Sequence, residues 1–145
     1  PRAIVRERER LFAMQADVEI AAVSALRDRL AALRVADPDI AMAIQYVNMA
    51  AGEYIDACGR EKTHDPGARL AVEESLSVVS VYLEELDDAS KERRFGIEDD
   101  DPFVQVKGRA LAALRDKALA LKKARVTIQG GLTGNERMSV DEELR

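Results

Sequence analysis

Three aspartate–proline pairs divide this chain and limit what it can fold into. They are Asp37-Pro38, Asp65-Pro66 and Asp101-Pro102. Proline loses no hydrogen bond at the first position of a helix, where the backbone N–H is unpaired anyway, and it pushes the preceding residue out of the α region. Aspartate at that preceding position accepts a bond from an exposed N–H and suits the positive end of the helix dipole. The pairs therefore predict three helix starts.

The stretches between these pairs carry the apolar spacing of amphipathic helices. We expect helices over about 2–34, 38–61, 66–94 and 102–129. In the second helix, apolar residues follow one another without a break at alternating intervals of four and three residues: Ile40, Ile44, Val47, Ala51, Tyr54 and Cys58. The stripes expected to face the core on the other helices are Leu11, Val18, Ala22, Leu26, Leu30 and Leu33; Val72, Leu76, Val79, Leu83 and Leu86; and Val104, Leu111, Leu114, Ala118, Leu121 and Ile128.

Short connections between the helices indicate the fold class. Residues 35–38 and 62–66 leave little chain, so each link is expected to join antiparallel neighbours. The chain is therefore predicted to be all-α, an antiparallel (up-down) four-helix bundle over residues 1–129 with a long first helix. Glycines at 130 and 131 should end the fourth helix. Residues 130–145 are predicted to be an irregular, flexible C-terminal tail with a short terminal helix from about 139.

Composition supports one globular domain. The 145 residues are 47% hydrophobic and 34% charged, but only 4% aromatic, which favours helix packing over a β-sandwich. The single cysteine, Cys58, cannot form an internal disulfide, and on its apolar stripe it should be packed rather than reactive. No apolar run approaches the roughly 18 residues that span a bilayer. We therefore expect a cytoplasmic chain without a membrane span.

Charge is distributed unevenly along the chain. Residues 67–101 hold four basic and eleven acidic residues, a net charge of −7, whereas residues 102–145 hold nine and five, a net charge of +4. We expect the acidic third helix to lie beside the basic fourth. The overall charge of −5 makes nucleic acid an unexpected partner. If nucleic acid or an anionic lipid surface were contacted at all, the contact would be at the basic cluster of Lys117, Lys122, Lys123 and Arg125.

Pairs of carboxylates supply a hint of enzymatic chemistry. Glu53 and Asp56 form a Glu-x-x-Asp segment, and Glu74 closes a Glu-Glu pair on the third helix. The first segment is similar to one half of the magnesium site of all-α nucleotide pyrophosphohydrolases. The other half of that site, Glu-Glu-x-x-Glu, has Ser77 in place of its third glutamate. The resemblance implies a Mg²⁺-dependent enzyme that uses Glu53, Asp56 and Glu74.

The leading prediction is a non-enzymatic helical-bundle module for protein interaction or regulation, without a cofactor, that associates with itself. The first helix, about 33 residues or ~50 Å long, exceeds the others, so its start should overhang. That overhang would present Ile4, Val5, Leu11 and Phe12 to a partner, most simply a second copy in a homodimer. Two alternatives stay open: the nucleotide pyrophosphohydrolase-like enzyme, and a cytosolic or adaptor domain of a larger protein, including a membrane protein.

Overall fold

The computed structural model describes residues 2–94 and 101–130 as four helices, and these residues contain no strand. The helices are α1 (Arg2–Ala31), α2 (Pro38–Glu61), α3 (Pro66–Arg94) and α4 (Pro102–Gly130). The predicted bounds of α2 and α3 are confirmed. α1 ends three residues earlier than predicted and α4 one residue later. The predicted terminal helix from about 139 lies outside the described residues.

The aspartate of each Asp-Pro pair caps the helix that follows, as predicted. Asp37 accepts bonds at one carboxylate oxygen from the backbone N–H groups of Asp39, at 2.9 Å, and Ile40, at 3.1 Å. Asp65 and Asp101 each accept one bond from the N–H two residues further on, at 2.9 and 3.0 Å. Since the first N–H groups of a helix lack intrahelical partners, these bonds fix where each helix begins.

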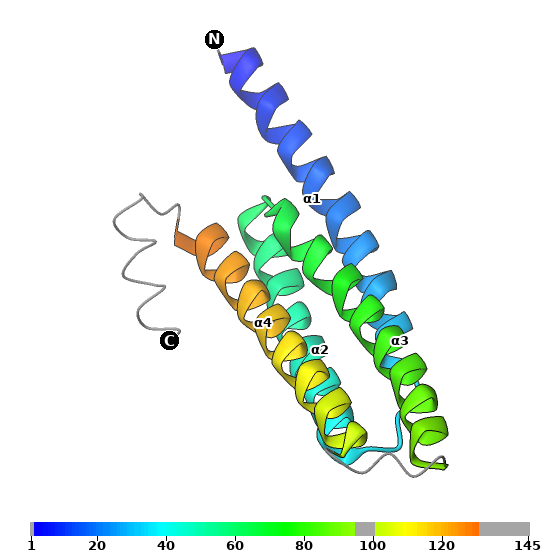
Figure 1. Ribbon diagram of the computed structural model, residues 1–145. Coiled ribbons are helices and arrows are strands. Elements are labelled where there is room, and N and C mark those ends of the chain that lie inside the picture. Colours follow the sequence, from blue (N-terminus) through cyan, green and yellow to red (C-terminus); the bar gives the residue numbers. More distant parts are fainter. Residues whose placement is uncertain (1, 95–100, 131–145) are drawn as a thin grey trace.

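The chain runs alternately down and up, so the up-down bundle is confirmed (Figure 1). α4 packs along both α2 and α3, and α1 packs against the same two helices from the other side. The order around the bundle is therefore α1, α2, α4, α3. α2 and α3 lie at diagonally opposite corners and make few contacts with each other. The prediction that the short 62–66 link joins neighbouring helices is wrong. That link crosses the diagonal, and α2 and α4 lie side by side with the same direction.

Charge favours this arrangement. Residues 35–66 hold two basic and six acidic residues, and α3 holds four basic and seven acidic residues, so direct pairing of α2 with α3 would oppose like charges. The basic helix α4 lies between them instead. Ion pairs of this exposed kind add little stability, but they select neighbours. Those that α4 makes with both acidic helices are Lys107–Asp37, Lys107–Asp39, Arg125–Glu53, Arg109–Glu85 and Lys117–Glu74.

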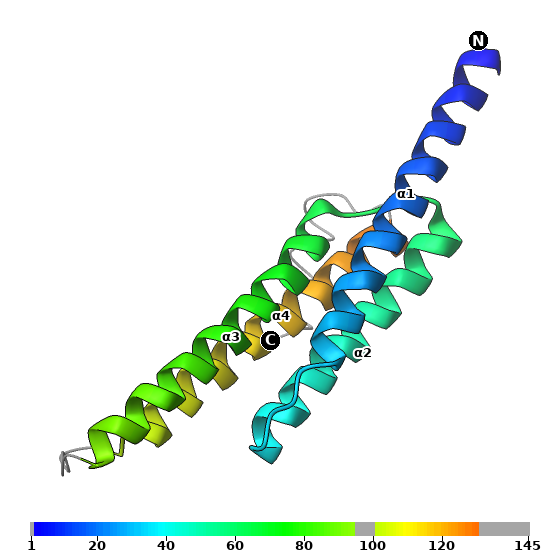
Figure 2. The ribbon, with the colours of Figure 1, turned by 90° about the vertical axis from the view of Figure 1, so that its right-hand side faces the viewer.

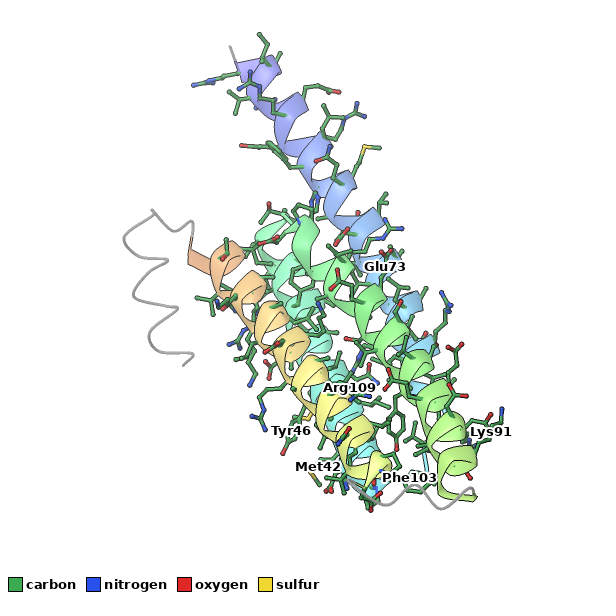
Figure 3. All side chains as sticks on the ribbon, in the orientation of Figure 1. Met42, Tyr46, Glu73, Lys91, Phe103 and Arg109 are labelled. Carbon is green, nitrogen blue, oxygen red and sulfur yellow. The ribbon has the colours of Figure 1, made fainter. Side chains whose placement is uncertain are left out.

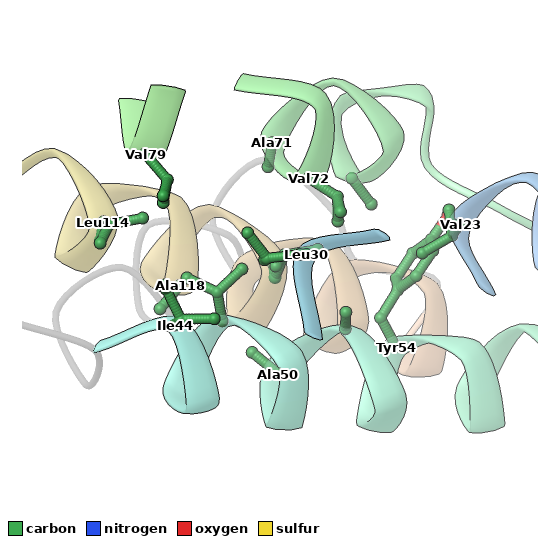
Figure 4. Close-up of a cluster of buried hydrophobic side chains, with 14 of the residues drawn as sticks. Val23, Leu30, Ile44, Ala50, Tyr54, Ala71, Val72, Val79, Leu114 and Ala118 are labelled. Atoms are coloured by element: carbon green, nitrogen blue, oxygen red, sulfur yellow. The ribbon is translucent and has the colours of Figure 1, made fainter. Parts of the chain in front are cut away.

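The core lies along the axis shared by α2, α4, α3 and the second half of α1 (Figure 4). The whole predicted stripe of α2 is buried. On α3 and α4 the predicted stripes are buried in part, but Leu83 is 40% exposed and Val104 is 66% exposed. Most of the residues buried in their place are small, and small side chains let helix axes approach closely. The buried residues of α3 and α4 that the pattern missed are Ala68, Ala71, Ser75, Tyr82, Ala89, Val106, Ala110 and Ala124.

The stripe predicted for α1 is confirmed towards the end of the helix, where Leu30 is buried and Leu26 and Leu33 pack against the core. Nearer the start it is wrong by about one residue around the helix: Leu11 and Val18 are exposed, whereas Ala16, Glu19 and Val23 are buried. One residue corresponds to about 100° of rotation. α1 carries apolar residues on two faces. The bundle covers the face of Ala16 and Val23 and leaves the face of Leu11 and Val18 exposed.

Candidate interaction surface

The N-terminal half of α1 projects beyond the rest of the bundle (Figures 1 and 2). Residues 2–15 are exposed except for the half-buried Ala13, and the first buried residue is Ala16. α2 ends and α3 begins near this level, and Phe12 lines a groove with Glu61 at the end of α2 and with Thr63 of the link that follows. The predicted overhang is present. The exposed fractions of its four predicted contact residues lie between 47% and 63%: Ile4, Val5, Leu11 and Phe12.

The apolar residues of α1 fall on two faces. Val5 and Phe12 continue the stripe that packs into the bundle further along the helix. Ile4 and Leu11 lie on the opposite face, which we call the outer seam of α1. Its members follow one another at alternating intervals of three and four residues, and all of them are exposed: Ile4, Glu7, Leu11, Met14, Val18, Ala21 and Ala25.

The outer seam faces away from the bundle along its whole length. Leu11, Val18 and Ala25 each stand five residues before a buried residue, namely Ala16, Val23 and Leu30. Five residues turn an α-helix by about 140° beyond one full turn, so each pair lies on nearly opposite sides. The seam therefore stays open to solvent both on the projecting segment and on the half of α1 that packs in the bundle.

Two open grooves lie beside α4. One, between α3 and α4, has a volume of about 470 Å³, with apolar residues that include Val81 and Tyr82, and the ion pairs of Glu74 and Glu85 at its sides. The other, between α2 and α4, also of about 470 Å³, is lined by Met42, Tyr46 and further residues of both helices. Figure 3 shows Met42 and Tyr46 on the outside of the bundle. This second apolar face of α2 was not predicted from the sequence, although Met42 and Tyr46 stand four residues apart.

Two of the four residues in the predicted basic cluster on α4 form ion pairs within the bundle. Lys117 pairs with Glu74 of α3, and Arg125 lies 3.3 Å from a carboxylate oxygen of Glu53 on α2. Lys122 and Lys123 are exposed, and Lys122 lines the groove between α2 and α4. The four side chains therefore do not form a single undivided cationic patch.

The three carboxylates proposed for magnesium do not come together. Glu53 and Asp56 lie on α2, and Glu74 lies on α3 across the diagonal of the bundle. Two of them, Glu53 and Glu74, are ion-paired with Arg125 and Lys117 of α4. Throughout residues 2–91 and 101–130, no three His, Cys, Asp or Glu side chains are placed so that they could hold a metal ion.

A buried polar group lies where α1, α2 and the start of α3 meet. The hydroxyl of Tyr54 accepts a bond from the N–H of Asp65, at 2.9 Å, and lies 3.0 Å from the carbonyl oxygen of the same residue. It also lies 3.5 Å from Oε1 of Glu19, but its single proton serves one of these acceptors at a time. The side chains of Tyr54 and Glu19 thus join α1 to the link between α2 and α3.

Burial governs the acid–base properties of this group. Glu19 is only 7% exposed, and loss of hydration raises the pKa of its carboxyl, although the nearby His64, Arg69 and Tyr54 lower it in part. Burial also raises the pKa of the Tyr54 hydroxyl and of the Cys58 thiol. A thiol with a raised pKa is a poor nucleophile. Cys58 is fully buried, which confirms the prediction that it is packed.

None of the four helices combines the length and the hydropathy that crossing a membrane requires, within the residues described. Comparison of the chain with protein-family models, with curated protein sequences and with solved structures found no match. A functional proposal for this chain therefore depends on the geometry of its own residues.

Proposed function

We propose that this chain is a non-enzymatic, cytoplasmic protein-interaction module that associates with itself through the projecting helix α1. The observation that carries the proposal is the outer seam of α1. Four large apolar side chains lie on it with nearly half or more of their surface in solvent: Ile4, Leu11, Met14 and Val18. Isolated apolar residues are ordinary on a protein surface, but a continuous row along a projecting element is typical of an interface.

The shape of α1 supports the same proposal. A helix that projects alone has no tertiary packing to stabilise it, and isolated helical segments of about this length are marginal in water. A partner lying along the seam would supply that packing. Two of the three carboxylates with which a hydrolase would bind metal, by contrast, form ion pairs with α4: Glu53 with Arg125 and Glu74 with Lys117. The arrangement favours assembly over catalysis.

Sedimentation of the whole chain tests the proposal. We expect a concentration-dependent dimer that the Leu11→Glu variant converts to monomer, because a charge would replace an apolar side chain in the seam. Val104→Glu is the matched control: Val104 is also an exposed aliphatic residue, 66% exposed, but lies on α4. It should leave association unchanged. A wild-type chain that stays monomeric at high micromolar concentration would overturn the proposal.

Location is tested separately. The proposal of a cytoplasmic module is supported by a lone buried thiol, Cys58, which has no second cysteine in the chain to pair with. Cell fractionation of the chain in its natural host should recover it with cytoplasmic markers, and recovery with a secreted fraction would contradict this part.

A further inference from the structure

We propose that two copies of the chain pair antiparallel along the outer seams of their α1 helices, with Arg10 of each copy opposite Asp17 of the other. This inference rests on the proposed function, because it names the partner and the geometry of the same surface. It follows from the seam's spacing, from the charges beside it and from the placement of the bundle.

The spacing of the seam is that of a coiled coil. Its positions alternate between three and four residues from Ile4 to Ala25, which makes three seven-residue repeats and a length of about 32 Å. Repeats of this kind keep one face of a helix against another helix over several turns. Six of the seven positions are apolar, and Glu7 is the exception. Side chains decrease in size from Ile4 and Leu11 to Ala21 and Ala25, so the seam is not uniform along its length.

That taper favours antiparallel pairing. In a parallel pair each seam residue would meet its own equivalent, so Glu7 would oppose Glu7 within an apolar seam, and two like charges would be desolvated together. Large residues would also meet large ones and alanines would meet alanines. In an antiparallel pair the ends are exchanged, so that Ile4 faces Ala21 of the second copy and Leu11 faces Met14 of the second copy. The large Ile4 at one end of the seam then meets the small Ala21, and the large side chains of Leu11 and Met14 meet at the centre of the dimer.

Charges beside the seam select one antiparallel register. Arg10 and Asp17 each precede a seam residue and so flank the contact on the same side. When Leu11 faces Met14 of the second copy, Arg10 faces Asp17 of the second copy, and the twofold axis repeats the pair. A slip of one repeat in one direction opposes Arg10 to Arg10, and a slip in the other opposes Asp17 to Asp17. Only the middle register brings opposite charges together.

The position of Arg10 suits this role. Its guanidinium lies 2.6 Å from a carboxylate oxygen of Glu7, a seam residue, so it is already held at the seam's edge. Both side chains are more than half exposed, and the pair leaves further donors of the guanidinium available. Arg10 can therefore reach across to Asp17 of a second copy while it partly neutralises Glu7.

The bundles do not obstruct this arrangement. Because the outer seam lies opposite the buried Ala16, Val23 and Leu30, each bundle sits on the far side of its own α1 (Figure 2). In the middle register the twofold axis passes between residues 12 and 13. The projecting segment of each copy then lies along the bundled part of the other copy's α1, as far as Ala21. Each copy thereby covers the part of the seam that the other leaves open.

Charge exchange tests the pairing in the full chain. Arg10→Asp and Asp17→Arg should each weaken dimerisation about tenfold, since each turns two attractions into two repulsions, and the double variant should restore it. Arg2→Asp, a matched reversal on the part of α1 that faces away from the seam, should leave the dissociation constant nearly unchanged. Failure of the double variant to restore dimerisation would overturn the pairing, because only the proposed register makes these two positions meet.

A distance measurement tests the direction independently. A nitroxide attached at an Ala3→Cys substitution should lie about 30 Å from its equivalent in an antiparallel dimer, against about 10 Å in a parallel one, and each slip of one repeat changes the antiparallel value by about 10 Å. The native Cys58 is buried and should not take up the label. A dimer with a short distance would overturn this inference and leave the proposed function standing, whereas a monomeric wild-type chain would overturn both.

Discussion

Lys107 of α4 lies with its ammonium nitrogen 3.0 Å from one carboxylate oxygen of Asp37, while the other oxygen of Asp37 caps α2. One side chain thus starts a helix and ties it to a neighbour. Burial alone would raise the pKa of Asp37, but the bonds from Ile40, Lys107 and Asp39 together outweigh it and hold that pKa below its ordinary value of 3.8. Asp39, 2.6 Å from the same ammonium, completes the contact.

Loss of this cap should destabilise the bundle measurably. We expect Asp37→Ala to lower the free energy of unfolding by about 1 kcal/mol, as removal of an N-cap side chain commonly does, measured by urea denaturation. Asp37→Asn should retain most of that free energy, because asparagine also caps helices, and Asp39→Ala should leave the cap intact.

The contribution of Asp37 should also depend on pH. A carboxyl whose pKa is lower in the folded state than in the unfolded chain stabilises the fold at pH values above its unfolded pKa. That stabilisation is lost as the pH falls through the folded pKa. The difference between wild type and Asp37→Asn should therefore shrink below about pH 4. Equal stability of Asp37→Ala and wild type at pH 7 would contradict the role.

A charge in the middle of the α2 stripe should abolish folding. Val47 is fully buried, so Val47→Asp places an unpaired carboxylate in the core, and we expect a loss of more than about 4 kcal/mol. Far-ultraviolet circular dichroism should show loss of the cooperative thermal transition. Gln45→Asp introduces the same charge at an exposed position of the same helix and should keep the transition. A folded Val47→Asp variant with a normal midpoint would contradict the burial of this stripe.

The sequence was sufficient to predict those parts of the fold that local chemistry decides. The Asp-Pro pairs set three helix starts, and every residue of the predicted α2 stripe is buried, because its spacing continues without a break along the helix. α1 offered two faces, and its spacing did not say which one the bundle would cover. Leu11 and Val18 fit a core stripe by their spacing alone, but the bundle leaves both exposed.

What could not be predicted depends on contacts between segments distant in the chain. The diagonal placement of α2 and α3 follows from where the basic α4 lies, which no single helix specifies. The buried group of Glu19, Tyr54 and Asp65 likewise arises only when three elements meet. The signal available in the sequence is a glutamate at Glu19, and it points to burial only once that face of α1 is known to meet the core.

The buried carboxyl of Glu19 should make stability fall as pH rises. Its pKa is raised above the ordinary 4.5, so the folded state holds the proton longer than the unfolded chain does, and stability is lost as pH rises through that interval. We expect Glu19→Gln to unfold at higher denaturant concentration than wild type at pH 7, by roughly 1 kcal/mol, with a flatter pH profile. Glu9→Gln, at an exposed position of α1, is the control. A less stable Glu19→Gln variant at pH 7 would indicate that the ionised group, with His64 and Arg69 facing it, is favourable.

Divalent cations should leave the stability of the chain unchanged. A ligand that binds only the folded state raises the unfolding midpoint in proportion to the logarithm of its concentration, so thermal unfolding with Mg²⁺, with Mn²⁺ and with a chelator is a direct test. Glu53 and Glu74 are paired with Arg125 and Lys117, and Asp56 does not converge with them, so no set of three oxygens is available to the ion among these residues. We therefore expect superimposable transitions at millimolar metal. A midpoint that rises with Mg²⁺ and returns to the chelator value in Glu53→Gln would show that the ion pair opens to bind metal, and would revive the hydrolase hypothesis.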